Sequence, residues 1–247
     1  MPRIVVVTGG AQNIGAAIAA RFRLAGDVVI CADLNPPQDH SLQFLATDVS
    51  SENSVQALMK QLASDFGHLD VLVNNAGIAI EHSIADTTVE DWDRVMAVNV
   101  RSTFLMTKHA LPLMRNTEAK DPAIVNISSI EGLGANPLHS AYAASKAAVA
   151  AFTHNTALEY GDYGIRCNAI APGWINTPFN DQLLAQYPNR DAVDSAIKAL
   201  HPVGRLGTPE DIAETAFWLA SPASGFISGQ EIVVDGGRLA RLPLPAL

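Results

Sequence analysis

Tyr142 and Lys146, four residues apart, are the pair in this sequence with the clearest capacity for chemistry. They lie in a run of small residues, 141–148, which is typical of a helix packed closely against a neighbour. On a helix, residues i and i+4 share one face, so the ammonium would lie beside the phenol. A tyrosine titrates at about 10, so deprotonation at neutral pH requires about 4 kcal/mol of differential stabilisation of the phenolate. Lys146 and a positively charged cofactor ring would supply it jointly, although the same spacing also occurs on ordinary exposed helices.

A glycine-rich turn at residues 8–15 predicts a binding site for phosphate groups. The turn, Thr-Gly-Gly-Ala-Gln-Asn-Ile-Gly, follows a β-branched strand and opens a helix. Glycines let the backbone approach a pyrophosphate closely, and the start of the helix offers free N–H groups and a partial positive charge. Because sharp strand-to-helix turns use glycine anyway, the turn alone is weak evidence.

Asp33 strengthens this interpretation. It lies 18 residues after Gly15, at the end of the second predicted strand. A carboxylate there would accept both ribose hydroxyls of NAD and repel the 2′-phosphate of NADP. Residues 34–40 contain no Arg or Lys that would hold that phosphate. The alternative is that Asp33 only forms a turn; in this context we favour the cofactor role and predict NAD as the cofactor.

Seven short β-branched runs alternate with helical patterns along the chain. Helical periods fall within residues 14–25, 55–62, 89–114 and 141–160, the third as one long helix. This alternation predicts a doubly wound α/β fold of the Rossmann type, with a seven-stranded parallel sheet and helices on both faces, in one domain spanning 1–247. Residues 178–208 form a proline-containing excursion that we expect to act as a substrate flap. The predicted strands are Arg3–Thr8, Val28–Ala32, Gln43–Thr47, Val71–Asn74, Ala123–Ser128, Arg166–Ala171 and Glu231–Val234.

Composition argues against several classes of protein. The net charge is −9 and no Lys/Arg cluster occurs, which disfavours nucleic-acid binding. The histidines are scattered without metal-ligand spacing, so no metal site is predicted. Cys31 and Cys167 lie in apolar runs and are expected to be buried thiols. No apolar stretch approaches the roughly 18 residues of a membrane span and no signal peptide is visible, so we expect a cytoplasmic protein without membrane contact.

Together, these motifs resemble the short-chain dehydrogenase/reductase family over essentially the whole chain, from Val5 to Gly237. The family's turn usually has glycine where this chain has Asn13. Asparagine tolerates left-handed backbone, so we expect the turn to be intact. The matching motifs are Thr8-Gly9-x-x-x-x-Ile14-Gly15, Asp48-Val49, Asn74-Asn75-Ala76-Gly77, Asn99 within Val98-Asn99-Val100, Ser129, Tyr142-x-x-x-Lys146 and Pro172-Gly173.

The resemblance implies an NAD-dependent dehydrogenase with the catalytic group Asn99, Ser129, Tyr142 and Lys146. Tyr142 would be the general base, Ser129 would hold the substrate oxygen, and Lys146 would lower the pKa of Tyr142 and bind the nicotinamide ribose. Asn99 would kink its helix and anchor a water that relays the proton. Because side chains alternate at a strand end, Ser128 would point elsewhere. The implied cofactor-binding residues are Gly9, Asn13, Ile14, Gly15, Asp33, Asp48, Val49, Asn75, Ala76, Gly77, Tyr142, Lys146, Ile175 and Thr177.

The expected substrate is a small molecule with a secondary hydroxyl group, its oxygen shared by Ser129 and Tyr142, with Trp174 bordering the same pocket. Glu131 and His139 would hydrogen-bond further hydroxyls of a polyol or sugar, unless Glu131 is simply a solvated loop charge. A ketoacyl or carbonyl reductase is the main alternative, disfavoured by the expected NAD preference and by the lack of a basic residue for an acyl carrier. A non-catalytic NAD-binding protein is the third possibility, disfavoured by the intact catalytic group.

The apolar surface of the two long helices predicts self-association. An exposed edge at the last strand would be paired or covered, and a second interface would form between helices, which together give a homotetramer of D2 symmetry. The leucines in the tail, residues 238–247, would lie at a subunit boundary or in a frayed terminus. The helical residues expected in the interface are Met96, Val100, Phe104, Ala148 and Phe152.

Overall fold

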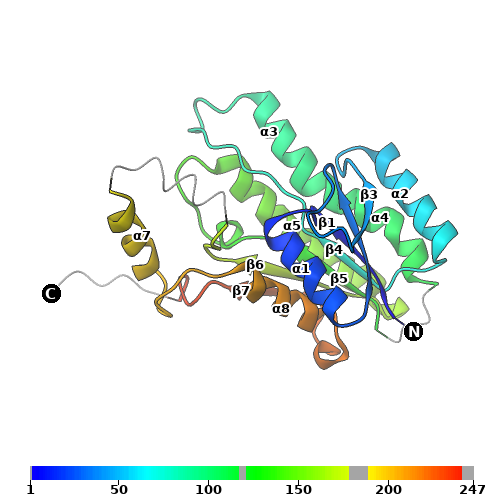
Figure 1. Ribbon diagram of the computed structural model, residues 1–247. Coiled ribbons are helices and arrows are strands. Elements are labelled where there is room, and N and C mark those ends of the chain that lie inside the picture. Colours follow the sequence, from blue (N-terminus) through cyan, green and yellow to red (C-terminus); the bar gives the residue numbers. More distant parts are fainter. Residues whose placement is uncertain (1, 117–120, 178–188, 241–247) are drawn as a thin grey trace.

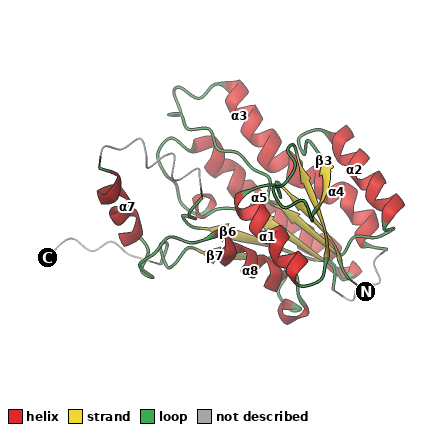
Figure 2. Cartoon of the chain, in the orientation of Figure 1, coloured by secondary structure: helices red, strands yellow, loops and turns green. Residues whose placement is uncertain are grey.

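The computed structural model describes residues 2–116, 121–177 and 189–240, in which seven strands form one sheet (Figure 1, Figure 2). The strand order is β3-β2-β1-β4-β5-β6-β7 and neighbouring strands are parallel. The direction of winding therefore reverses between β1 and β4. The strands are β1 (Ile4–Thr8), β2 (Val28–Asp33), β3 (Gln43–Ala46), β4 (Val71–Asn74), β5 (Ala123–Ile127), β6 (Arg166–Pro172) and β7 (Glu231–Val234).

The predicted fold class is confirmed, and each strand boundary lies within one residue of its predicted position. The reason is burial on both faces. Every residue of β1, β4, β5 and β6 is buried, so most residues in these strands are apolar, without the alternation of a half-exposed strand. The outermost strands β3 and β7 are only partly buried.

Helices cover the sheet on both sides (Figure 1). α1 (Asn13–Leu24) and α8 (Pro209–Leu219) pack on one face, where Phe22 and Phe217 meet edge to face with ring centroids 5.4 Å apart. α2 (Glu52–Asp65), α4 (Ser102–Met114) and α5 (Ser140–Tyr160) cover the other. The sequence analysis missed α8, which begins with a capping box between Thr208 and Asp211.

The long helix predicted over residues 89–114 is present over that whole range, but it is not a regular α-helix throughout. α3 (Val89–Met96) and α4 are joined by a π-helix, η1 (Ala97–Arg101). Wider turns of this kind are rare and accommodate one additional residue. The π-helix contains Asn99, the residue that was expected to kink this helix.

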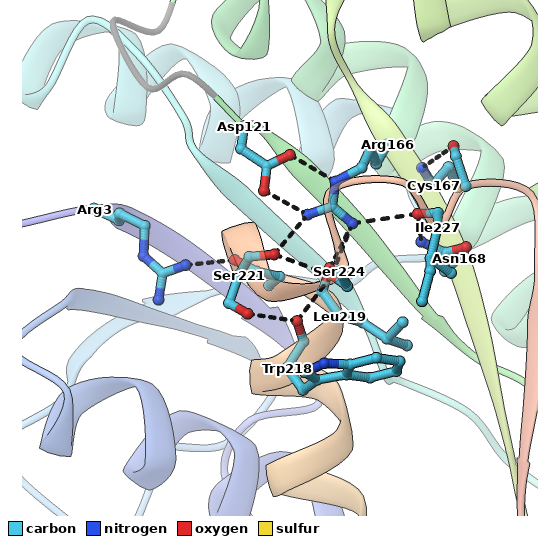
Figure 3. A network of polar contacts seen from close by, with 12 residues as sticks. Arg3, Asp121, Arg166, Cys167, Asn168, Trp218, Leu219, Ser221, Ser224 and Ile227 are labelled. Carbon is cyan, nitrogen blue, oxygen red and sulfur yellow. Dashed lines mark hydrogen bonds and ion pairs between the residues drawn. The ribbon is translucent and has the colours of Figure 1, made fainter.

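A network of hydrogen bonds and ion pairs ties the chain together at the amino ends of the strands (Figure 3). The buried guanidinium of Arg166, at the start of β6, donates to the two carboxylate oxygens of Asp121 at 2.6 and 2.8 Å. It also donates to the Leu219 carbonyl at 2.8 Å and to Ser224 Oγ at 3.1 Å. Arg166 therefore connects β6 to the end of α8 and to the segment before β5.

Arg3, immediately before β1, has a similar arrangement. Its guanidinium donates to both carboxylate oxygens of Asp27 at 3.0 and 2.6 Å and to the Ala220 carbonyl at 2.5 Å. Asp70, before β4, accepts the backbone N–H of Ile4 at 2.7 Å. Charged side chains at the amino ends of the strands thus connect β1 to the turn before β2, to the end of α8 and to the segment before β4.

The predicted flap is described only in part. Its helical pattern corresponds to α7 (Arg190–Ala199), where Val193 and Ile197 pack with Trp174 and Leu206. Residues 178–188 lie outside the described residues, so the flap role stays a prediction. Cys31 and Cys167 are buried free thiols, as predicted. Within the described ranges, no helix has the length and apolar character to cross a membrane, and no cluster of His, Cys, Asp or Glu is suited to a metal ion.

Candidate active site

The predicted site residues lie beyond the carboxyl ends of the strands, which all point to one edge of the parallel sheet. The glycine turn follows β1, Asp33 ends β2, Asn75 follows β4, and Ser129 follows β5. In doubly wound folds ligands bind in the crevice where the winding reverses, here between β1 and β4. The topology therefore gathers these residues from widely separated parts of the chain.

The glycine turn has the backbone geometry that a phosphate cradle requires. Gly9 has φ +62° and Asn13 has φ +51°, so asparagine does adopt the left-handed conformation expected of it. A Cβ on Gly15 would lie 2.0 Å from the Gly9 carbonyl oxygen, which fixes glycine at that position. No side chain caps the N-terminus of α1 and its first turn carries no acidic residue. Its N–H groups and partial positive charge suit the phosphates of a dinucleotide.

Asp33 is a turn-forming residue and also lies against the glycine turn. One carboxylate oxygen accepts the backbone N–H of Asn35 at 3.1 Å, which is the turn-forming interpretation. The other accepts the backbone N–H of Ala11 at 3.1 Å. The two interpretations of Asp33 are therefore compatible, because the carboxylate that forms the turn lies beside the predicted cofactor site.

Thr8 and Asn75 lock the end of β4 against the glycine turn. Thr8 Oγ1 accepts the backbone N–H groups of Asn75 at 2.9 Å and Ala76 at 3.1 Å. Asn75 Nδ2 donates in return to the carbonyls of Thr8 and Gly9 at 3.0 and 3.1 Å. The sequence analysis quoted Thr8 in the turn motif and gave it no role. The feature of the sequence from which this role could have been predicted is a hydroxyl side chain directly before the first glycine of the turn.

Asn99 joins three segments through its buried side chain. Its Oδ1 accepts the backbone N–H of Ile78 at 2.8 Å, and its Nδ2 donates to the Ile78 carbonyl and to Ser145 Oγ, both at 2.9 Å. Ser145 donates onward to the Tyr142 carbonyl at 2.6 Å. A Cβ on Gly77 would lie 3.4 Å from Asn99 Oδ1 and 3.3 Å from Lys146 Nζ, so a small residue suits this position. Ser145 is a second residue to which the sequence analysis gave no role.

Ser129, Tyr142 and Lys146 come together as expected. Ser129 lies close enough to Tyr142 to lower its pKa, and Lys146 Nζ lies 5.5 Å from the centroid of the Tyr142 ring. The neighbouring hydroxyl of Ser128 points elsewhere and donates to the Lys146 carbonyl at 3.0 Å. Lys146 is 4% exposed and its ammonium donates to the Ile127 carbonyl at 2.8 Å. The arrangement places a phenol, a hydroxyl and an ammonium within one small site.

The pKa values of Tyr142 and Lys146 shift in opposite directions. Burial raises the pKa of Tyr142 to about 12, with a lowering contribution from the Ser129 hydrogen bond and a raising one from the charge of Glu131. Burial lowers the pKa of Lys146 to about 8. In the protein alone burial is the largest effect on Tyr142, so the joint lowering of its pKa by Lys146 and a bound cofactor stays a prediction.

Glu131 and His139, which we expected to bind substrate hydroxyls, bind each other. His139 Nδ1 lies 2.8 Å from a Glu131 oxygen, and its Nε2 lies 3.2 Å from an oxygen of Glu81. Glu131 is therefore not a solvated loop charge, and both nitrogens of His139 have partners. Glu81 is a third residue that the sequence analysis missed, since nothing in its local sequence marks it.

The remaining predicted residues are less closely gathered. Asp48 is exposed and accepts hydrogen bonds from Ser50, whereas Val49 is part of the core. Ile175 is buried beside Gly207, and Thr177 is half-buried at the end of the described segment. The indole N–H of Trp174 is buried without a hydrogen-bond partner among the described residues. These positions border the site, and their contacts with ligands stay predictions.

Comparison with known proteins agrees with this geometry. A family model described as enoyl-(acyl carrier protein) reductase matches residues 9–238. The chain is 41% identical over 249 residues to a cis-4-hydroxycyclohexanecarboxylate dehydrogenase of Sinomonas cyclohexanicum, covering 96% of this chain and 97% of the relative. It is 37% identical over 251 residues to a cyclopentanol dehydrogenase of a Comamonas species, with coverage of 96% and 97%.

Solved structures give the same result. The ligand-free aldohexose dehydrogenase of Thermoplasma acidophilum superposes with a TM-score of 0.94 at 34% sequence identity, covering 100% of this chain and 97% of the other. Proteins of this kind bind a nicotinamide nucleotide and act on CH–OH groups, which are oxidised to carbonyl groups or formed from them by reduction. With a matching family model, full-length relatives and a site at the carboxyl edge of the sheet, the chain belongs to the short-chain dehydrogenase/reductase family.

Proposed function

We propose that this protein oxidises a secondary alcohol, such as a cyclic alcohol, polyol or sugar, with NAD as the hydride acceptor and Tyr142 as the general base. The observation that carries the proposal is the approach of two groups to Tyr142: Ser129 lies close enough to lower its pKa, and the ammonium of Lys146 packs against the same ring. Relatives named as dehydrogenases of cis-4-hydroxycyclohexanecarboxylate and of cyclopentanol, and a structural neighbour named for aldohexoses, support the substrate class.

Each side chain has a defined part in this reaction. Ser129 holds the substrate oxygen, and the Tyr142 phenolate takes its proton, so charge that develops on the oxygen is met by two positioned groups. Lys146 holds the nicotinamide ribose and, while protonated, stabilises the phenolate. Asn99 orders the helix beneath Lys146 through Ser145 and Ile78. A bound nicotinamide nucleotide supplies the hydride acceptor.

The preference for NAD rests on Asp33. Its carboxylate lies at the end of β2 and contacts the glycine turn through Ala11. A 2′-phosphate there would meet this negative charge, and residues 34–40 offer no cation to compensate it. The same features disfavour a reductase of acyl-carrier substrates that works with NADP.

A substrate screen tests the proposal. Purified protein is mixed with NAD and, in turn, cyclic secondary alcohols, polyols, sugars and hydroxy acids, and formation of reduced nicotinamide is followed by absorbance. We expect turnover with at least one secondary alcohol, with NAD preferred over NADP, and loss of turnover in Tyr142→Phe. Equal efficiency with both cofactors contradicts the role of Asp33, and an active Tyr142→Phe variant contradicts the role of the phenol.

We also infer a homotetramer. Phe104 of α4 is 46% exposed and packs edge to face on Phe152 of α5, at 6.5 Å between ring centroids. Phe226, shortly before β7, is fully exposed. These two apolar regions fit two different self-complementary interfaces. Light scattering coupled to size exclusion tests the inference, and a monomer mass at micromolar concentration contradicts it. The predicted interface role of the tail, residues 238–247, falls mostly on residues 241–247, which lie outside the described residues, and deletion of residues 240–247 tests it.

A further inference from the structure

Glu81, His139 and Glu131 form a cluster next to Tyr142 that is not part of the expected catalytic group. The imidazole of His139 lies between the two carboxylates, 2.8 Å from Glu131 and 3.2 Å from Glu81. The His139 and Tyr142 rings meet edge to face, with centroids 6.1 Å apart. The three side chains are 35%, 20% and 14% exposed for Glu81, His139 and Glu131, so the cluster lies at the border between solvent and the site.

This geometry defines the protonation state of His139. A neutral imidazole has one N–H donor, and its other nitrogen would direct a lone pair at a carboxylate. Both ring nitrogens of His139 face carboxylates, so the imidazolium is the form that satisfies both contacts. Accordingly the pKa of His139 is raised, chiefly by Glu131 and further by Glu81. In return, the hydrogen bond from His139 helps to keep the pKa of Glu131 below its ordinary value despite burial.

The backbone connects this cluster to the catalytic residues. The His139 carbonyl accepts the N–H of Ala143 at 2.8 Å, in the first turn of α5, which carries Tyr142. The N–H of Glu131 donates to Ser129 Oγ at 3.2 Å. The chain after β4 joins the same point, because the N–H of His82, next to Glu81, donates to the Leu138 carbonyl at 3.0 Å.

The backbone conformation of Leu138 indicates that the contact of His139 with the two carboxylates costs free energy to form. It has φ +70°, a left-handed conformation that a leucine rarely adopts. Such a conformation persists only where surrounding contacts hold it. The His82 hydrogen bond on one side and the two-carboxylate contact of His139 on the other are the contacts that hold it here.

We propose that Glu81, His139 and Glu131 act as a positioning triad for Tyr142, in which an imidazolium clamped between two carboxylates fixes the start of α5 relative to Ser129. This inference rests on the proposed function of Tyr142. His139 thus acts through Tyr142 and does not bind a substrate hydroxyl. Other charged groups facing the triad are Lys146 beside the Tyr142 ring and Arg238, which follows β7 and interacts electrostatically with Glu131.

Steady-state kinetics separate positioning from substrate binding. The variants are Glu81→Gln, His139→Gln and Glu131→Gln, with Glu90→Gln, an exposed carboxylate at the start of α3, as the matched control. Each is assayed with NAD on two alcohols, one without further hydroxyls and one polyol. For Glu81→Gln and His139→Gln we expect kcat to fall about tenfold on both alcohols with little change in KM, because the base is misplaced for every substrate.

The pH profile adds a second readout. The negative charge of Glu131 opposes ionisation of Tyr142, so Glu131→Gln moves the rise of the oxidation rate to lower pH. Glu90→Gln leaves both kcat and the profile unchanged. The triad is overturned if Glu81→Gln behaves as Glu90→Gln does. It is also overturned if KM rises for the polyol alone with kcat unchanged, which would make these residues substrate ligands.

A measurement without turnover distinguishes failure of the triad from failure of the proposed function. The imidazole pKa of His139 is measured by NMR titration in the wild type and in Glu81→Gln. We expect it to fall in Glu81→Gln and to stay at the wild-type value in Glu90→Gln. An unchanged value in Glu81→Gln overturns the triad even in an active enzyme, whereas a wild type that oxidises no alcohol contradicts the proposed function alone.

Discussion

At the amino ends of the strands, Arg166 and Arg3 are each neutralised by a carboxylate, whereas at the carboxyl ends the buried ammonium of Lys146 donates to a backbone carbonyl. The first arrangement joins separate segments of the chain. The second lowers the pKa of Lys146 to about 8 and accompanies a Tyr142 pKa of about 12. At the amino edge of the sheet, ion pairs thus hold segments of the chain together. At the carboxyl edge, Tyr142 and Lys146 are groups whose protonation would respond readily to a bound ligand. Substitutions at the two edges should therefore separate stability from activity.

Tyr142→Phe should have the largest effect, and it should fall on activity alone. Loss of a general base costs on the order of 10³-fold in kcat. The ring and its contacts with His139 and Lys146 remain, so the melting temperature and NAD affinity should stay close to those of the wild type. Steady-state kinetics, calorimetry and cofactor titration measure the three quantities. A large loss of stability would instead place Tyr142 among the structural residues.

Arg166→Leu should have the converse effect. It leaves the Asp121 carboxylate without its partner and removes the hydrogen bonds to Leu219 and Ser224. Breaking a buried ion pair on one side costs about 3 kcal/mol of unfolding free energy. Chemical denaturation measures this loss, while kcat/KM well below the melting temperature should be unchanged.

Lys198→Met is the matched control for Arg166→Leu. Lys198 pairs with Asp194 on the exposed side of α7 at 2.6 Å. A pair of this kind on a helix surface contributes about 0.5 kcal/mol or less. If both variants lose equal stability, the amino-end network has no special structural role.

The rate of alcohol oxidation should rise with pH. In the proposed reaction the phenolate of Tyr142 is the active form, and the pKa of Tyr142 in the protein is raised, so the active fraction would grow as pH increases. Below the plateau, kcat/KM should increase about tenfold per pH unit. The pH of the plateau then measures how far a bound cofactor lowers the pKa of Tyr142, at about 1.4 kcal/mol per unit. A rate independent of pH from about pH 6 to about pH 9 would rule out the phenol as the titrating base.

Asp33→Ala should have the smallest of these effects. Removal of the carboxylate takes away both a ribose acceptor and the repulsion of a 2′-phosphate, so the ratio of kcat/KM for NAD over NADP should fall about tenfold. Asp39→Ala is the control, since Asp39 is an acidic, exposed residue that also forms a local turn, with Ser41. Equal changes in the two variants would mean that overall charge, and not the position of Asp33, sets the preference.

The sequence predicted the sheet well because burial on both faces leaves short, mostly apolar runs in β1, β4, β5 and β6. It also predicted which residues would gather at the site, since parallel strands deliver their carboxyl ends to one edge. Ser129, Tyr142, Lys146 and Asn99 all lie there.

Features that depend on tertiary approach were not predictable. Glu81 lies far along the chain from its partner His139, and its neighbours in sequence carry no sign of the contact. The sequence shows the lysine next to Tyr142 in the helix, but it does not show that burial of the phenol raises its pKa in the protein alone. A short apolar helix such as α8, preceded by prolines, was overlooked beside the predicted flap.

The π-helix at Ala97–Arg101 has a consequence for the angular phase of the helix that contains it. An α-helix advances about 100° per residue, so one additional residue in a wide turn rotates everything after it by about that angle relative to everything before. α3 and α4 therefore continue along one axis, but residues with the same sequence spacing point in different directions in the two helices. The additional residue in the wide turn allows Asn99 to face Ile78 and Ser145, while Phe104, farther along the helix, stays at the surface. A single additional residue thus lets two surfaces of one helix face different directions: the inner surface faces the reacting groups, and the outer surface faces solvent.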